Sequence, residues 1–204
     1  MKRTIFILLV LLFVWAPGAA FVYVYGEIPD HEYEALKALY DATGGSNWYK
    51  DDNWFTGDAP VNTWHGIKCD RENKHVLEIR LSGNNLKGKL PSQLGAIKNL
   101  KVLIFRKNRL THIPPELANL THLEILDVGD NWLKGNIPSW IGNLKSLKEL
   151  YLDLNEFTGP IPASLGNLSN LLHLNLYRNR LSGNIPEEME NLSNLVTLNL
   201  GYNQ

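Results

Sequence analysis

The sequence has a single cysteine, Cys69, and neither sign of charge dominates it. One cysteine excludes an internal disulfide framework. A formal net charge of −1 supplies no basic footprint for nucleic acid. Histidine, cysteine and acidic residues do not cluster with metal-ligand spacing, and no phosphate-binding loop occurs. We therefore expect no cofactor, no metal ion and no nucleic-acid partner.

A long apolar run occurs only at the amino terminus. Lys2 and Arg3 precede it, and Gly18-Ala19-Ala20 offers small residues for cleavage after Ala20. Residues 1–25 thus have the pattern of a secretory signal peptide. The alternatives are a buried structural helix and an uncleaved anchor, because residues 4–25 would span about 33 Å as a helix and could cross a bilayer. Signal peptide and anchor both predict an exported protein, either secreted or at the cell surface.

Most of the chain is an internal repeat. The segment 147–170, LKELYLDLNEFTGPIPASLGNLSN, recurs almost unchanged as 171–194. An asparagine recurs at steps of 24, 23, 24, 24 and 24 residues, at Asn84, Asn108, Asn131, Asn155, Asn179 and Asn203. A proline keeps the same period, at Pro91, Pro114, Pro138, Pro162 and Pro186. Two markers with one period indicate stacked, equivalent coils.

The spine L-x-x-L-x-L-x-x-N-x-L-x-G-x-I-P resembles the plant-type leucine-rich repeat, over roughly residues 30–204. The resemblance implies an α/β right-handed solenoid with a parallel sheet on its concave face and a helical N-terminal cap. It places the cap at 26–75 and the repeats at 76–204, as five full turns and a partial sixth. This family includes receptor ectodomains and secreted inhibitors, so the resemblance also implies extracellular recognition without enzymatic activity.

Residue alternation explains the repeat independently of the family. Within L-x-x-L-x-L, alternate side chains point to opposite faces of an extended strand. The inward set is Leu103, Phe105, Leu126, Val128, Leu150, Leu152, Leu174 and Leu176. One coil cannot bury its own leucines, so neighbouring coils must stack on it. The asparagine amide can both donate and accept, which suits an inward turn beside the strand.

Residues 30–75 are expected to cover the apolar end of the first coil. Asp30 is placed to N-cap a helix that runs to about Ala42, and Gly44-Gly45 would end it. Three tryptophans follow, Trp48, Trp54 and Trp64. We interpret them as the core of the cap, with a sugar-stacking site as the alternative.

The segments EALKALYDATGGSNWYKDDNW and WHGIKC resemble the N-terminal cap of the same family, which usually carries two bonded cysteines. Here Asn62 occupies the first cysteine position, so Cys69 has no partner within the chain. We expect a buried, inert thiol, with pairing to another chain as the alternative.

At the other end the expectation is a solenoid without a C-terminal cap. The last strand, with Leu198 and Leu200, would then leave an open edge and an uncovered apolar end. Either a truncated gene product or a partner that covers this end would explain the pattern.

The outward residues of the predicted sheet form its exposed face. Val102, Ile104 and Ile125 make an apolar strip beside an acidic middle. The candidate ligand-binding residues are Arg106, Asp127, Glu149, Tyr151, Asp153, His173, Tyr177 and Arg178. Exposed tyrosines among mixed charges are typical of interfaces. We expect a peptide or protein ligand with a basic residue opposite Asp127, Glu149 and Asp153, with an ordinary solvated face as the alternative.

Two further functional classes could use this face. Glu149, His173 and Thr197 occupy one column of the sheet, with neighbours about 4.8 Å apart. An acid, a histidine and a hydroxyl in a row could belong to a hydrolase. This is a remote alternative, because the sequence indicates no oxyanion hole or pocket beside them. A structural or ice-binding surface protein would need a regular array of threonines. The central outward column is instead irregular, at Arg80, Ile104, Asp127, Tyr151, Asn175 and Asn199.

Three N-x-[ST] sequons fall at one repeat position, at Asn119, Asn167 and Asn191. Glycosylation there would leave the concave face clear, although the repeat consensus itself generates part of this pattern. Trp132 and Trp140 lie in the return path and are secondary contact candidates, with packing at the solenoid edge as the alternative.

Overall fold

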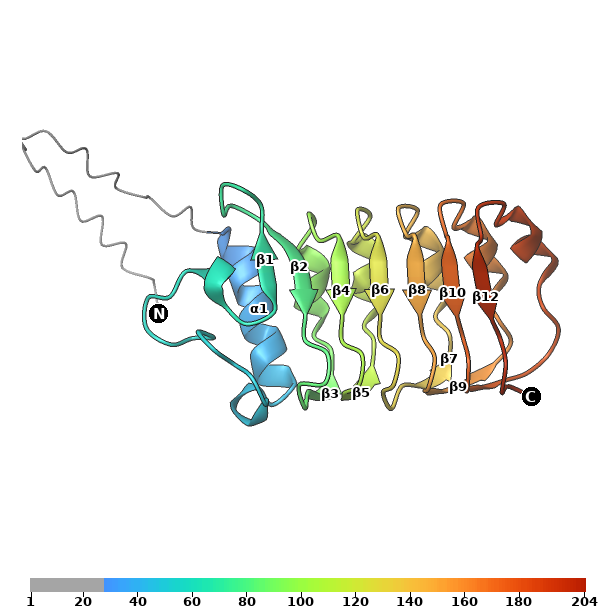
Figure 1. Cartoon of the computed structure of the whole chain (residues 1–204), viewed down its shortest axis with the longest axis horizontal. Coiled ribbons are helices and arrows are strands. Elements are labelled where there is room, and N and C mark those ends of the chain that lie inside the picture. Colours follow the sequence, from blue (N-terminus) through green and yellow to red (C-terminus); the bar gives the residue numbers. More distant parts are fainter. Residues whose placement is uncertain (1–27) are drawn as a thin grey trace, which may run out of the picture.

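The computed structural model describes residues 28–204, and the chain forms an elongated solenoid of side-by-side coils with a helical element at one end (Figure 1). The predicted signal peptide or anchor at 1–25 lies outside the described residues. Within residues 28–204, no helix has the length and apolar character needed to cross a membrane.

One side of the solenoid is a seven-stranded sheet in the order β1-β2-β4-β6-β8-β10-β12. The strands are β1 (Ile67–Cys69), β2 (Val76–Arg80), β4 (Val102–Ile104), β6 (Ile125–Asp127), β8 (Glu149–Tyr151), β10 (His173–Asn175) and β12 (Thr197–Asn199). β1 pairs antiparallel with β2, and the later pairs are parallel. Leu174 pairs in register with Leu150 on one side and Leu198 on the other, which confirms that successive repeats are adjacent strands.

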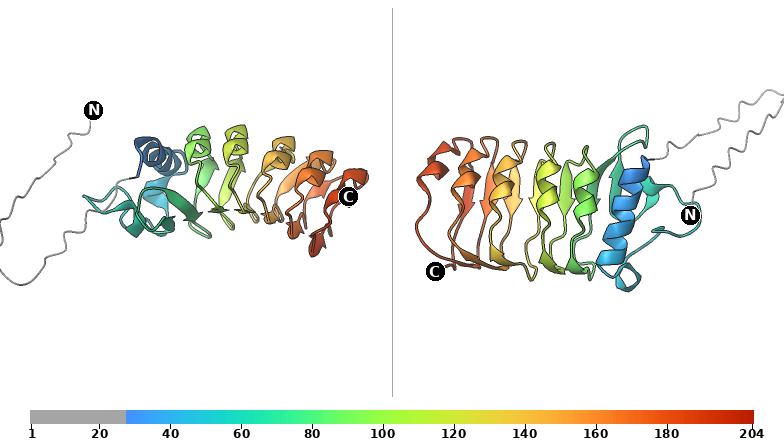
Figure 2. Two further views of the ribbon diagram at one scale, coloured as in Figure 1. Left: turned by 90° about the horizontal axis from the view of Figure 1, so that it is seen from above. Right: turned by 180° about the vertical axis from the view of Figure 1, so that it is seen from behind.

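The opposite side of each coil closes with one turn of 3-10 helix. These turns are η3 (Ser92–Ala96), η4 (Pro115–Asn119), η5 (Ser139–Asn143), η6 (Ala163–Asn167) and η7 (Glu187–Asn191). Figure 2 shows them along the outer side of the solenoid, with the sheet on the inner side. The proline before each turn has an extended backbone and fixes the point where the turn begins.

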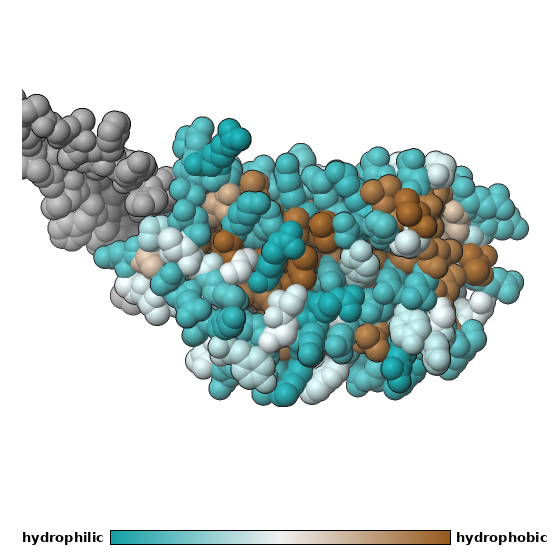
Figure 3. All heavy atoms as spheres, viewed as in Figure 1, coloured by the Kyte–Doolittle hydropathy of each residue, from teal (hydrophilic) through white to brown (hydrophobic). Residues whose placement is uncertain are grey.

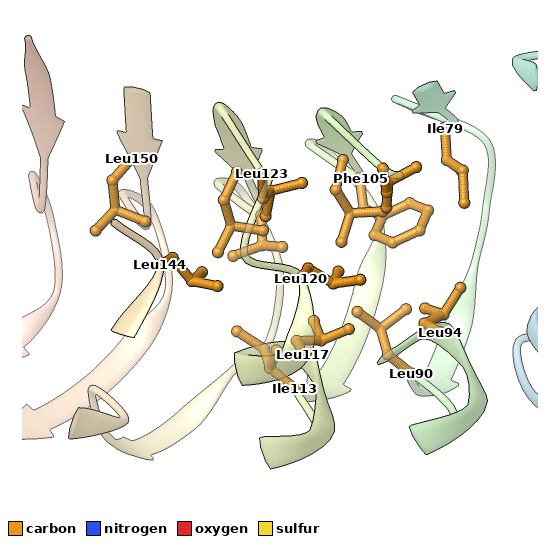
Figure 4. Packing of buried hydrophobic residues seen from close by; sticks show 14 of the residues in the cluster. Ile79, Leu90, Leu94, Phe105, Ile113, Leu117, Leu120, Leu123, Leu144 and Leu150 are labelled. Atoms are coloured by element: carbon orange, nitrogen blue, oxygen red, sulfur yellow. The ribbon is translucent and has the colours of Figure 1, made fainter. Parts of the chain in front are cut away.

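The core lies between the sheet and the 3-10 turns. All the side chains predicted to point inward from the sheet are buried, with Leu103 and Phe105 fully so. Leu94 and Leu117 reach the same interior from the turns, and Figure 4 shows them pointing toward the sheet residues. Burying a leucine contributes about 2 kcal/mol, so the repeated leucines hold the stacked coils together.

A flank of short strands, which the sequence analysis did not predict, connects the sheet to the 3-10 turns. It contains β3 (Lys87–Lys89), β5 (Arg109–His112), β7 (Lys134–Asn136), β9 (Glu156–Gly159) and β11 (Arg180–Leu181). β3 pairs with β5, and β7 and β11 both pair with β9. The Trp132 amide donates to the Leu110 carbonyl at 2.9 Å, so the two groups of strands are continuous.

The recurring asparagine forms a buried ladder between the sheet and this flank. The Asn131 side-chain nitrogen donates to the carbonyls of Phe105 and Val128 at 3.0 and 3.1 Å. Its oxygen accepts from the Leu110 amide at 3.0 Å. Asn108, Asn155, Asn179 and Asn203 repeat these contacts. Each asparagine thus satisfies backbone groups of its own coil and of the preceding coil, as the residue type predicted.

The cap begins with α1 (Asp30–Ala42), followed by η1 (Gly45–Asn47) and η2 (Val61–Thr63). The predicted end of the helix is confirmed, because Gly44 has φ +74° in the left-handed region just beyond it. The prediction that Asp30 is the N-cap is wrong. Pro29 holds that position, and Asp30 lies in the first turn, where its charge favours the helix dipole.

The three tryptophans form the core of the cap, and an exposed sugar-stacking site is excluded for them. Trp54 is almost fully buried, with Trp48 and Trp64 against it at ring-centroid distances of 5.0 and 5.1 Å. Their indole nitrogens donate to backbone carbonyls within the cap. The aromatic cluster therefore covers the first coil with its polar groups satisfied.

Two side chains fasten the cap to the repeats. The buried Glu32 carboxylate of α1 accepts from the Val76 amide at 2.7 Å and contacts His75 Nδ1 at 2.9 Å. Asn84 exchanges hydrogen bonds with the backbone of Lys50 at 2.7 and 2.8 Å. The cap backbone thus takes the place that a preceding coil would hold in the asparagine ladder.

Cys69 is buried and unpaired, as expected. Burial raises the pKa of its thiol to about 12, so the reactive thiolate does not form near neutral pH. Asn62 lies in η2 and carries a buried side-chain oxygen without a hydrogen-bond partner in residues 28–204.

Candidate ligand-binding face

The outward face of the seven-stranded sheet is open and carries the predicted ligand-binding residues. Figure 3 shows hydrophobic side chains gathered over β2 to β6, and again over β8 to β12, with hydrophilic side chains between and around them. Ile104 and Ile125 are half-buried, whereas Val102 is 8% exposed. The apolar strip is therefore present, but two isoleucines provide most of its accessible surface.

A closed ion network occupies the middle of the face. Arg106 Nε donates to Asp127 at 2.8 Å, and its terminal nitrogens donate to both oxygens of Asp153 at 2.6 and 3.1 Å. Both carboxylates are buried, at 8% and 3% exposed. A ligand's basic residue is expected opposite Asp127, Glu149 and Asp153. Arg106 already pairs with both aspartates, but its single positive charge against their two negative charges leaves the network with a net charge of −1, so this expectation stays a prediction.

The network depends on a glycine that the sequence analysis missed. Arg106 and Asp153 come from the second and fourth repeats, and the residue between them is Gly129. A Cβ built on Gly129 would lie 2.5 Å from an Arg106 nitrogen and 2.8 Å from Asp153 Oδ1. The available signal was a glycine at an outward position of the spine, where the second, fourth and fifth repeats carry Arg106, Asp153 and Tyr177.

The electrostatics of the network follow from burial and pairing. Burial raises the pKa of the Asp127 carboxyl. The hydrogen bonds from Arg106 and the Gly129 amide lower this pKa, but burial has the larger effect. The hydrogen bonds to Asp153 raise the pKa of Arg106 above its usual range. Arg106 therefore stays charged, and its Cζ lies 5.8 Å from the centre of the Tyr151 ring. The guanidinium is thus held in place by two carboxylates and lies near the Tyr151 ring.

The acid, histidine and hydroxyl column does not form a proton relay. The structure pairs Glu149 with Tyr151, whose hydroxyl donates at 3.0 Å. His173 Nδ1 instead contacts the Thr197 hydroxyl at 2.8 Å. Although the registers of Glu149, His173 and Thr197 are adjacent as predicted, the acid and the histidine have different partners. The arrangement gives a hydrogen-bonding surface that lacks the geometry of a catalytic triad.

The remaining predicted residues gather at the far end of the face. The ring of Tyr177 lies against that of Tyr202, with the centroids 5.1 Å apart. Arg178, which follows Tyr177, is exposed. A Cβ added at Gly201 would approach the Tyr177 ring at 3.5 Å, so this tyrosine leans over the next coil. The face thus has an apolar region, a closed ionic centre and an aromatic end with a free cation in its described residues.

Comparison with protein families decides the classification of the chain. Residues 74–204 match the family description "Leucine-rich repeat region", which covers more than half of the chain. The chain belongs to the leucine-rich repeat family. The fold expected from the spine is therefore confirmed, and this leucine-rich repeat protein has its cap and sheet in the positions described above.

Relatives of this leucine-rich repeat protein are plant receptors. It is 42% identical over 85 residues to the leucine-rich repeat receptor-like serine/threonine-protein kinase RGI4 of Arabidopsis thaliana. That segment covers 41% of this chain and 8% of the kinase, so the chain spans a small part of the curated relatives it matches. The kinase activity in this name belongs to the relative.

Several solved structures of similar fold are plant receptors or their ectodomains. The BIR2 ectodomain of Arabidopsis thaliana has a TM-score of 0.76 at 26% identity, over 87% of this chain and 94% of that one. The plant peptide hormone receptor RGFR1, in complex with RGF2, has a TM-score of 0.55 at 33% identity, over 62% of this chain and 24% of that one. The similarity thus extends across most of the leucine-rich repeat protein, including its cap.

The secondary candidates of the leucine-rich repeat protein lie away from the sheet face. Asn119, Asn167 and Asn191 are exposed and end three of the 3-10 turns on the outer side. Trp132 is 51% exposed on the flank of short strands, whereas Trp140 is partly buried against the core. Of the two tryptophans, Trp132 keeps its place as a contact candidate.

Proposed function

We propose that this leucine-rich repeat protein recognises an extended peptide or protein segment on the outward face of its sheet, in a receptor-like or inhibitor-like role outside the cell. The observation that carries the proposal is the composition of that face. Exposed aliphatic and aromatic side chains flank an ionic centre in which both buried carboxylates are paired with Arg106. Such a face offers apolar area to a ligand without leaving buried charges unpaired.

Each region of the face has a distinct part in this proposal. Ile104 and Ile125 bury an apolar side chain of the ligand. Arg106 and Tyr151 form a rigid support beside them, because the guanidinium is held on two sides. His173, Tyr177 and Arg178 supply hydrogen bonds and aromatic area at the far end, and Glu149 accepts from a ligand donor. Rigid groups lose little entropy on binding, which favours affinity.

The receptors similar to this chain support extracellular recognition, and one of them is a peptide hormone receptor in complex with its ligand. We propose the same compartment here, with export through residues 1–25 and a division into a cap at 26–75 and repeats at 76–204. The family match at 74–204 supports that boundary. The proposed role involves no chemistry on the ligand, since Glu149 and His173 have separate partners.

A capture experiment with matched variants tests the proposal. The purified protein is used to capture ligands from the extracellular fluid of the organism that produces it. The affinity of one captured ligand is then measured by titration. Ile104→Asp should weaken its binding at least tenfold, because the substitution places a charge in the apolar strip. Ile185→Asp is the matched control, since Ile185 is exposed and lies outside the sheet.

Equal binding by the wild type and Ile104→Asp would place the ligand elsewhere and refute the proposal. Both variants should retain the wild-type circular dichroism spectrum and unfolding midpoint to within a few degrees. A loss of binding that appears equally in Ile185→Asp would indicate general destabilisation and would also count against the proposed site.

A further inference from the structure

The flank of short strands carries unpaired positive charge although the chain as a whole has a formal net charge of −1. We call the residues Lys87, Lys89, Arg109, Trp132 and Lys134 the cationic ledge. Lys87 and Lys89 are the exposed residues of β3, and Arg109 begins β5 beside Lys87 in register. Trp132 and Lys134 follow in the next coil. The ledge thus crosses three adjacent coils on one flank (Figure 1).

Several cations of the sheet face pair closely with carboxylates, whereas three of the four cations of the ledge form no ion pair within residues 28–204. On the sheet, Arg106, Arg80 and Lys148 pair with carboxylates at 2.6 to 2.8 Å. Within residues 28–204, no carboxylate forms an ion pair with Lys87, Lys89 or Arg109. Lys134 reaches Glu156 only at 3.9 Å, and Glu156 is shared with Arg180 at 3.2 Å. The ledge therefore has a net positive charge that the protein itself does not balance.

A tryptophan stands in the middle of this charge. Trp132 is 51% exposed, and Arg109 Cζ lies 5.8 Å from the centre of its ring. The guanidinium contacts only part of the ring, so aromatic surface is left to solvent. Leu110 and Leu133, the inward neighbours on these strands, are buried in the core and fix the strand backbone. Trp132 thus projects from a rigid base.

We propose that the cationic ledge is a second binding surface, separate from the sheet face, for an acidic protein segment that contains an aromatic residue. The carboxylates of the segment would pair with Lys87, Lys89 and Arg109, and its aromatic ring would pack on the open part of Trp132. Tryptophan and arginine are the residue types that most often carry binding energy between proteins. That composition favours a protein occupant over an anionic polysaccharide, which the same charges would attract.

Binding to defined polymers tests the ledge. The purified protein is titrated with poly-L-glutamate, with a glutamate–tyrosine copolymer and with heparin. The copolymer should bind most tightly, and its affinity should fall as salt rises, because the pairs are exposed. Lys87→Glu with Arg109→Glu should weaken copolymer binding at least tenfold. Trp132→Ala should remove the advantage of the copolymer over poly-L-glutamate while leaving the latter's affinity within twofold.

The matched control reverses two lysines elsewhere. Lys98 and Lys145 are exposed and follow η3 and η5, on the flank opposite the ledge, so Lys98→Glu with Lys145→Glu changes the net charge equally. This control should bind the copolymer within twofold of wild type. An equal loss in both double variants would mean that only net charge matters and would overturn the proposal. Tight binding to heparin without binding to either polypeptide would overturn it as well.

Discussion

At the scale of single residues, the asparagine ladder shows how one side chain determines the path of the chain. Each asparagine meets three or more backbone groups from two coils, and no other neutral side chain offers a donor pair and an acceptor in so short a length. The residue before each of these asparagines has a positive φ, as at Lys107, Asp130 and Leu154. The ladder therefore also offsets the cost of a left-handed residue in every coil.

Asn131→Ala is expected to be strongly destabilising. It leaves the carbonyls of Phe105 and Val128 and the amide of Leu110 buried without partners, so the free energy of unfolding should fall by about 3 kcal/mol. Asn203→Ala removes equivalent contacts at a partly exposed position, where water can replace them, and should cost about 1 kcal/mol. Urea unfolding of both variants measures the difference, and equal losses would contradict a burial-dependent role.

At the scale of elements, the ion network joins three repeats through one side chain. Arg106 spans from its own coil to Asp153 two coils away, which Gly129 permits by having no side chain. The network therefore couples neighbouring coils by polar contacts in addition to their shared leucine core.

Gly129→Ala tests this coupling. The new methyl group would lie within 2.5 Å of the guanidinium, so Arg106 must leave Asp153, and that buried carboxylate loses its counter-charge. The expected cost is about 3 kcal/mol in the free energy of unfolding. Gly135→Ala is not a suitable control, because its φ of +81° strains any side chain. Asp153→Asn combined with Gly129→Ala should recover part of the loss, and the absence of recovery would refute the network as the cause.

The cap offers a second test at this scale. Asn62 in η2 and Cys69 in β1 belong to elements that contact each other, and the resemblance places the first cysteine of the cap at position 62. Asn62→Cys should therefore form a disulfide with Cys69 during oxidative folding and stabilise the protein by about 2.5 kcal/mol, as loop closure over this short span predicts. Because the pKa of Cys69 is about 12, the bond should form slowly once the cap has folded.

Intact mass and thermal unfolding, each with and without reductant, measure the outcome. Asn62→Ser is the control, since it removes the amide without supplying a thiol and should show no dependence on reductant. Two free thiols in the oxidised double-cysteine protein would show that the side chains at 62 and 69 do not face one another.

The elements also show what the sequence could predict and what it could not. The strand positions and their register follow from the period, because the leucine and asparagine positions leave one arrangement that buries both. The cap helix follows from its apolar spacing, although its first residue was misassigned by one position. The strands of the flank were missed because alternation over two to four residues is too short to recognise. The pairing of Arg106 was missed because it depends on a side-chain path across Gly129, which periodicity does not describe.

At the scale of the whole molecule, stability is a sum over coils and the contacts between neighbours. Leu150 lies between two equivalent leucine strands and is fully buried, whereas Leu198 has the same place in its own repeat and is 46% exposed. Identical residues in identical local structure thus differ only in how many neighbouring coils cover them.

The pair Leu150→Ala and Leu198→Ala isolates this contribution of stacking. Leu150→Ala should lower the free energy of unfolding by about 3 kcal/mol, because a cavity opens between two coils. The urea midpoint should shift equally for the cap and for the repeats. Leu198→Ala should cost less than about 1 kcal/mol, since its side chain is already half in water. Urea titration followed by tryptophan fluorescence, which reports on the three cap tryptophans together with Trp132 and Trp140 in the repeats, and by circular dichroism, which reports on all coils, measures both. Equal costs would mean that each coil is stabilised by its own contacts, and the interdependence of neighbouring coils would then not explain the fold.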